Sequence, residues 1–147
     1  TTLFEQGVIY NIYGKLKGSW DIQNNIGVSN GTSKSDTTLF DVHVADEPAS
    51  TPFSGSFKSS IPNKSKFFKV TGKISFSSNK TVCEHLYKQN RNNLKDGYMD
   101  PIKGDIFIVD IRGTGTLALL QITEINSDDP AAGSINTGKM TFKYWKD

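Results

Sequence analysis

The stretch from residue 106 to residue 125, IFIVDIRGTGTLALLQITEI, decides the fold class. Apolar and β-branched residues fill both of its ends, and a Gly-Thr-Gly turn at residues 113–115 separates them. This pattern predicts two antiparallel strands, at residues 106–111 and 117–125, joined by a tight turn. Residues 117–120 read Leu-Ala-Leu-Leu, so the second strand is predicted to be buried on both faces.

A third strand is predicted near the C-terminus. Met140, Phe142 and Tyr144 occupy alternate positions there, which places their side chains on one face of a strand. Together with the two strands before it, this segment predicts a β-meander at the C-terminal end of the chain.

Alternation with a period of two also dominates the earlier part of the chain, where turn residues separate short apolar runs. Strands are predicted at residues 3–13, 16–22, 39–44, 57–61 and 67–76. In the last of these, Phe68 and Val70 share the predicted apolar face, and Lys69 lies on the other face.

One helix is predicted between these strands and the meander. Thr81 and Glu84 are three positions apart and match a capping box, and the helix is expected to end near residue 92. Its apolar stripe follows helical spacing and comprises Val82, Cys83, Leu86 and Tyr87.

These segments predict one mostly β domain over residues 1–147, a β-barrel or a β-sandwich with one helix inserted before the C-terminal meander. A chain of 147 residues can bury a core without disulfides, and Cys83 is its only cysteine. No stretch approaches the ~18 consecutive apolar residues of a membrane-spanning helix, so a soluble protein without a membrane partner is expected.

Charge is segregated along the sequence. Residues 57–95 hold nine basic residues and one acid, Glu84, so their net charge is +8, whereas the rest of the chain carries −6. Such a segment predicts a basic face that docks onto an acidic partner, a second copy of the chain or a phosphate backbone. The residues predicted for this face are Lys58, Lys66, Lys69, Lys73, Lys88 and Arg91, with Trp145 as an exposed aromatic side chain beside them.

Signals for catalysis or metal binding are weak. Cys83 and His85 lie two positions apart on the predicted helix, about 200° around its axis, and so face different ways. Cys83 is expected in the core, and His43 at the surface or partly buried. No Gly-x-Ser-x-Gly motif lies between a strand and a helix, and one Cys-x-His pair does not supply the four ligands of a structural zinc site. We expect no enzymatic activity, no metal ion and no cofactor.

Two other functions fit the same region. Lysines that alternate with Phe57, Phe67 and Phe68 are typical of an OB-like sheet that binds single-stranded nucleic acid. An ordinary amphipathic sheet, with its phenylalanines buried and its lysines in water, gives the same pattern. Exposed aromatic side chains on a sandwich would instead suit a carbohydrate or an adhesin-like role; Phe53 and Trp145 are the candidates, whereas Trp20 is expected in the core.

The last third of the chain also carries a resemblance. Asp100-Pro101-Ile102-Lys103-Gly104-Asp105 precedes a strand, residues 119–125 read LLQITEI, an acidic loop with Pro130 follows, and residues 138–144 read GKMTFKY. In this order the segments resemble the β-barrel portions of tailed-bacteriophage neck and baseplate-hub proteins.

The resemblance implies a structural component of the virion that is assembled in the host cytoplasm. Its partners would be other virion proteins or copies of itself, in a homo-oligomer or a hetero-complex, and no catalytic residues carry over. The short chain and the single helix differ from the neck proteins and fit a decoration or baseplate accessory protein.

Overall fold

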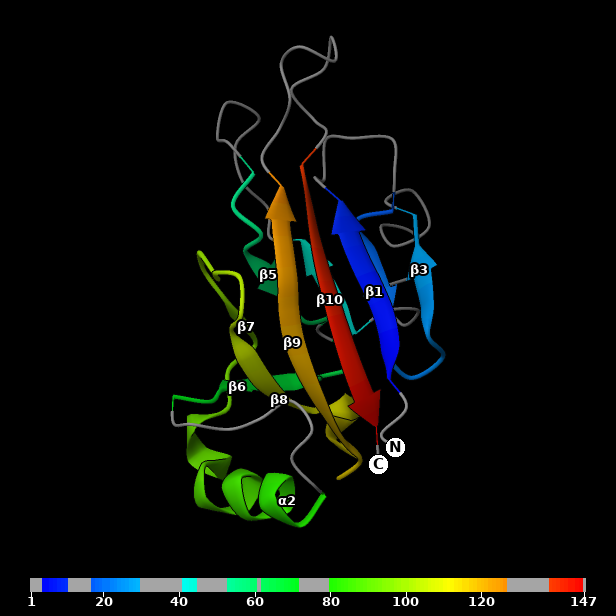
Figure 1. Cartoon of the computed structure of the whole chain (residues 1–147). Coiled ribbons are helices and arrows are strands. Elements are labelled where there is room, and N and C mark those ends of the chain that lie inside the picture. Colours follow the sequence, from blue (N-terminus) through cyan, green and yellow to red (C-terminus); the bar gives the residue numbers. More distant parts are fainter. Residues whose placement is uncertain are drawn as a thin grey trace, which may run out of the picture.

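The computed structural model describes residues 4–10, 17–29, 41–44, 53–60, 62–71, 80–126 and 138–146. Within them, two antiparallel five-stranded sheets pack against each other (Figure 1). One α-helix lies against the outer face of the sheet with the longer strands, called here the long-strand sheet. The long-strand sheet has the order β1 (Glu5–Tyr10), β10 (Lys139–Lys146), β9 (Leu117–Asn126), β8 (Ile106–Asp110) and β6 (Lys66–Lys69). The short-strand sheet has the order β3 (Ile26–Val28), β2 (Ser19–Asp21), β4 (Val42–Val44), β5 (Phe57–Lys58) and β7 (Gly97–Tyr98).

The fold is mostly β with one α-helix before the C-terminal meander, as predicted. The sheets of the described residues are not closed into a barrel, so a β-sandwich is the predicted architecture that fits. In the same part of the chain, no helix has the length and apolar character to cross a membrane.

The predicted meander is confirmed. β8, β9 and β10 are consecutive neighbours and pair antiparallel, and η3 (Ile111–Gly113) lies in the turn between β8 and β9. Residues 117–120 of β9 are each at most 3% exposed. Ala118 and Leu120 belong to the core between the sheets, whereas Leu117 and Leu119 belong to a second cluster beneath the helix. The Leu-Ala-Leu-Leu run is therefore buried on both faces because one face meets the other sheet and the opposite face meets a helix.

Aromatic and branched side chains fill the core between the sheets. Phe142 reaches across to β1, where a Cβ on Gly7 would lie 2.5 Å from its ring, so glycine is required at that position. Trp20 packs edge-on against Phe142, with ring centroids 6.1 Å apart. The fully buried members of this core include Ile9, Phe67, Phe107, Ile122, Phe142 and Tyr144.

The predicted helix is α2 (Lys80–Gln89), and a 3-10 turn, η2 (Arg91–Asn93), follows it. It begins at Lys80, so Thr81 lies inside the helix and is not its N-cap residue. Cys83 is buried, as expected, but Val82 is 41% exposed and does not belong to the apolar stripe. Only one face of a helix can contact a flat sheet, which is why the stripe is narrower than predicted.

The prediction for Trp145 is wrong. Its side chain is 8% exposed and packs in the cluster beneath α2 with Cys83, Ile108 and Leu119. Trp145 does alternate with the core-facing Tyr144, but the outer face of this sheet is covered by the helix and not by solvent.

The face assignment on β6 is also wrong. Phe67, not Phe68, points into the core and is 0% exposed, whereas Val70 packs against the cluster beneath α2. β6 ends at Lys69, and residues 72–76 of the longer predicted strand lie outside the described residues. Period-two alternation cannot show which face is inside when both faces carry apolar side chains.

The two sheets meet along one edge. Phe67 of β6 and Lys95 exchange two backbone hydrogen bonds of 2.8 Å, and three residues later Tyr98 of β7 pairs with Phe57 of β5. A Cβ on Gly97 would lie 2.1 Å from the Phe57 carbonyl oxygen, so the close approach of β7 to β5 requires glycine. This edge brings residues from β5, β6 and the segment before β7 together.

Candidate interaction surface

The structure gathers only part of the predicted basic face. Lys58 lies on β5, and Lys66 and Lys69 lie on β6, beside the edge where the sheets meet. Lys88 and Arg91 lie apart from them in sequence, on α2 and η2, and Arg91 stacks over the Tyr87 ring at 5.7 Å. Lys73 lies outside the described residues, and Trp145 is buried.

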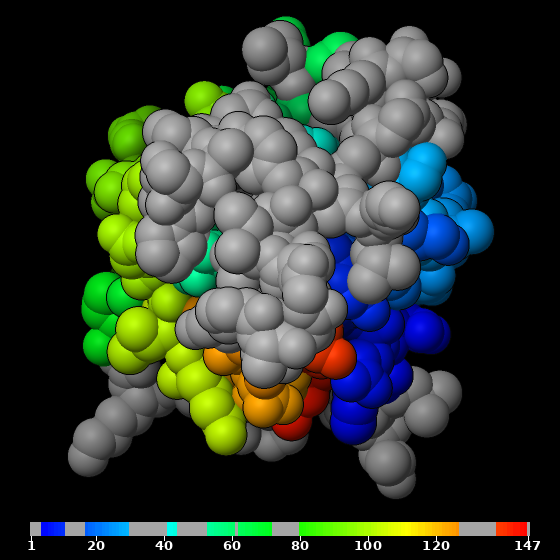
Figure 2. Space-filling view, turned by 90° about the horizontal axis from the view of Figure 1, so that it is seen from above, coloured from blue at the N-terminus to red at the C-terminus, as the bar shows by residue number. Residues whose placement is uncertain are grey.

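A cavity of about 510 Å³ lies at this edge. We call it the seam cavity, and its lining consists of Lys58, Ser59, Ser60, Lys64, Lys66 and Asp96. Among the described residues, this lining has three ammonium groups and one carboxylate. In Figures 1 and 2, β7 and the yellow-green segment after it lie on the side of the molecule opposite the blue strands β1 and β3.

A turn at Pro62 and Asn63 places Lys64 at this cavity. The Lys64 backbone N–H donates a 2.9 Å hydrogen bond to the Ser60 carbonyl, and Lys64 adopts a left-handed φ of 57°. Ser60 itself is 2% exposed, so the turn is anchored against the body of the protein. Lys64 is not among the residues predicted for the basic face, because a turn in the sequence does not show which neighbouring side chains its residues meet.

Two acids from beyond the basic segment pair with its lysines. Asp96 forms an ion pair with Lys66, and the Asp105 carboxylate lies 3.5 Å from Lys69 Nζ. Asp96 lies one position and Asp105 ten positions after the end of the basic segment at residue 95. In the folded protein, these two acids therefore offset part of the positive charge of that segment. These pairs lower the net positive charge of the surface.

The phenylalanines that alternate with the lysines are core residues. Phe57 and Phe67 are 3% and 0% exposed and contact each other edge to face, with centroids 5.0 Å apart. Phe53 is also buried, at 7% exposure, and Trp20 is partly buried and donates its Nε1–H to the Tyr144 hydroxyl at 2.9 Å. Base stacking and sugar stacking both need an open aromatic face, which these four side chains do not offer.

Sequence reasoning missed a buried ion network. Arg112 Nε donates to Asp41 Oδ1 at 2.9 Å, and Arg112 Nη2 donates to Asp21 Oδ1 at 3.1 Å. The Asp41 side chain, 0% exposed, also accepts hydrogen bonds from the Ser65 hydroxyl and the Ile22 N–H. We call Arg112, Asp21, Asp41 and Ser65 the Arg112 clamp. It ties β2 and the start of β4 to the turn between β8 and β9.

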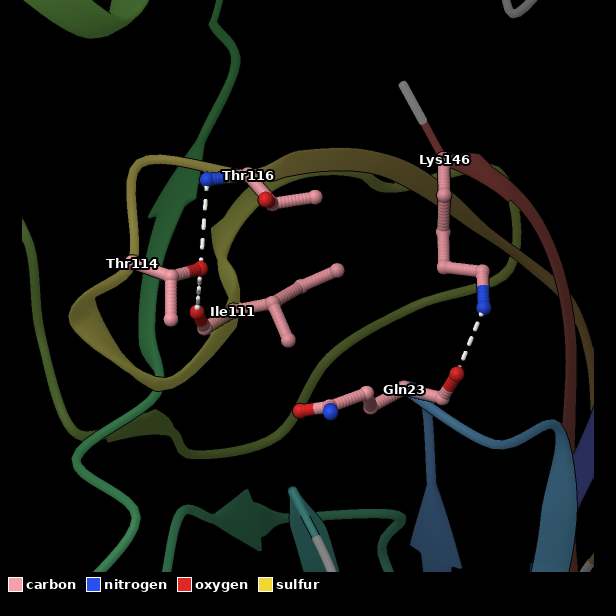
Figure 3. A pocket seen from close by; sticks show the side chains of 5 residues that line it. All are labelled: Gln23, Ile111, Thr114, Thr116 and Lys146. Atoms are coloured by element: carbon pink, nitrogen blue, oxygen red, sulfur yellow. Dashed lines mark hydrogen bonds between the residues drawn. The ribbon is translucent and has the colours of Figure 1, made fainter.

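A second cavity, of about 270 Å³, is lined by Gln23, Ile111, Thr114, Thr116 and Lys146 (Figure 3). Its polar groups already bind one another, since Lys146 Nζ donates to the Gln23 carbonyl at 2.8 Å and Thr114 Oγ1 donates to the Ile111 carbonyl at 2.7 Å. The same Thr114 oxygen accepts from the Thr116 N–H. These bonds hold the Gly-Thr-Gly turn and the end of β10 in place.

Residues considered for catalysis lie apart. Cys83 is buried at 1% exposure, His85 is exposed on the same helix, and His43 is 6% exposed on β4. Among the described residues, no three His, Cys, Asp or Glu side chains are grouped in a way that could hold a metal ion.

Tyr144 gives the fold a pH dependence. Burial chiefly raises the pKa of Tyr144 from its ordinary value of 10 to about 12, because the phenolate would lose its hydration. A raised tyrosine pKa contributes stability that is complete below pH 10 and is lost as the pH rises through about 12. The loss is expected to be roughly 2–3 kcal/mol.

Urea denaturation between pH 9 and pH 12 checks this prediction. Tyr144→Phe removes the titrating group, so the difference in unfolding free energy between the wild type and this variant is expected to narrow above pH 10. A difference that stays constant over the range would contradict the assignment to Tyr144.

Comparisons with protein-family models, with curated proteins and with solved structures found no match. The described residues thus define a mostly β sandwich with a basic cavity at the edge where its sheets meet.

Proposed function

We propose that the protein is a non-enzymatic assembly protein that docks through the seam cavity onto an acidic protein surface. The observation that carries the proposal is that Lys58, Lys64 and Lys66, from the continuous stretch of residues 58–66, line one cavity. Complementary charge steers two proteins together and fixes how they align. The setting we propose is a tailed-phage particle, as a neck, baseplate or decoration component, on the resemblance of the last third of the chain to neck and baseplate-hub proteins.

A second copy of the chain is one suitable partner. Exposed acids outside residues 57–95, such as Glu5, Asp100 and Glu124, could contact the basic cavity of the next copy, which would give a head-to-tail contact. Repeated around an axis, such a contact gives a ring if its rotation closes. The resemblance to neck and baseplate-hub proteins favours a ring.

Light scattering on the protein alone, at low and at high salt, tests this function. The wild type is expected to form a discrete species several times heavier than its 16.2 kDa chain, and high salt should dissociate it, because salt screens charges at a contact. Lys64→Glu/Lys66→Glu should be monomeric at both salt concentrations, since it reverses two of the three cavity lysines.

The matched control is Lys88→Glu/Lys103→Glu, which changes the net charge equally on exposed residues outside the cavity lining. It should assemble as the wild type does. Equal disruption by both variants would mean that overall charge, and not the cavity, drives assembly. Tight binding of oligo-dT with a steep salt dependence, lost in the Lys64→Glu/Lys66→Glu variant, would replace the proposal with nucleic-acid binding.

A further inference from the structure

The main chain at Asp96 is fixed at the wall of the seam cavity. Its carbonyl accepts a 2.6 Å hydrogen bond from the Ser59 N–H, and its neighbours pair on both sides, Lys95 with Phe67 and Gly97 with Lys58. The backbone therefore holds the Asp96 side chain at one place beside the cavity lysines.

The carboxylate of Asp96 is held far less firmly than its backbone. Its side chain is 74% exposed, its ion pair is with Lys66, and the Lys66 side chain is itself 38% exposed. Exposed ion pairs contribute little to stability, since both charges are well solvated apart. A carboxylate from outside can therefore take the place of Asp96 at little cost to the fold.

We infer that the seam cavity is a carboxylate site that the protein's own Asp96 occupies in the unbound state. An acidic peptide segment of a partner, rich in Asp or Glu, displaces Asp96 from Lys66 and also binds Lys64 in the same cavity. This inference rests on the proposed function. It adds that the partner binds through Asp or Glu side chains, and that Asp96 competes with them and weakens docking. The cavity already has one carboxylate among its three lysines, and the neighbouring Phe57 and Phe67 rings are buried, so a peptide carboxylate fits better than a nucleic acid.

Asp96→Asn is the decisive variant. It removes the competing charge but keeps the side-chain size, so Lys66 is released and the net charge of the lining rises by one. Fluorescence anisotropy with labelled hexaglutamate peptide at low salt is expected to show about three- to tenfold tighter binding than in the wild type.

Asp100→Asn is the matched control. It removes the same charge four residues away, outside the cavity lining, and asparagine tolerates the left-handed φ of 49° at that position. Its affinity for hexaglutamate should stay within about twofold of the wild type, because an exposed charge at a distance is screened. Lys64→Gln should weaken binding about tenfold in both the wild-type and the Asp96→Asn backgrounds.

The outcomes separate this inference from the proposed function. Hexaglutamate binding that depends on Lys64 but is no tighter in Asp96→Asn would overturn the competitor role and leave the docking function standing. No binding by either protein, with a monomer at every salt concentration, would overturn both. Equal gains in Asp96→Asn and Asp100→Asn would also reject the competitor role, because net charge alone would then account for the effect.

Discussion

Arg112→Met is expected to lower the free energy of unfolding by about 3–5 kcal/mol, because removing one partner of a buried ion pair leaves the other charge without compensation. Asp41 is 0% exposed and Asp21 is 4% exposed, so neither carboxylate can regain full hydration. Arg112 has a left-handed φ of 55°, and this backbone conformation costs methionine as much free energy as arginine. The loss of stability in Arg112→Met therefore reports the loss of the guanidinium group.

Urea denaturation of Arg112→Met beside Arg91→Met checks this result. Arg91 is the only other arginine, is exposed, and makes a cation–π contact with Tyr87, so its loss should cost no more than about 1 kcal/mol. Adding Asp41→Asn to Arg112→Met should recover part of the loss, since it removes one buried charge. Equal effects of the two arginine substitutions would contradict a structural role for the Arg112 clamp.

Phe67→Ala is expected to cost about 3–5 kcal/mol, the usual range for truncating a buried phenylalanine. Its ring is fully buried where the two sheets meet, and it contacts Phe57 edge to face. The cavity left by its removal would lie beneath the backbone bridge to Lys95, so the edge of the sandwich should loosen as well.

Phe68→Ala is the control for Phe67→Ala, since the two residues are adjacent in β6 and point to opposite faces. Phe68 is only partly buried, and its truncation should cost less than half as much. Thermal denaturation of both variants distinguishes the two faces. A larger loss for Phe68→Ala would restore the face assignment that the sequence predicted and reject the one in the structure.

The meander and the helix could be predicted from sequence because each depends on local pattern. The run at residues 117–120 is apolar at every position, and Met140, Phe142 and Tyr144 alternate cleanly, so their burial follows from periodicity. The burial of Trp145 could not be predicted from periodicity. Its burial depends on α2, which covers the outer face of the sheet, and no local pattern states which face a helix will cover.

The candidate site was only half predictable. A run of lysines between residues 57 and 95 indicated a basic region, but the pairing of Lys66 with Asp96 depends on how β6 and β7 meet. No pattern in the sequence indicated the Arg112 clamp. A lone arginine after a strand and two aspartates near other strands are common, and only the folded chain brings them within hydrogen-bond distance.

The Arg112 clamp also bears on how fast the chain folds and unfolds. Arg112 is separated by 91 residues from Asp21, by 71 from Asp41 and by 47 from Ser65, so each contact closes a long loop. Loop-closure entropy opposes such contacts until neighbouring strands have assembled, which places the clamp late on the folding pathway. An interaction formed after the transition state slows unfolding more than it speeds folding. We therefore expect the clamp to slow unfolding and so to lengthen the lifetime of the folded state once the sandwich has formed.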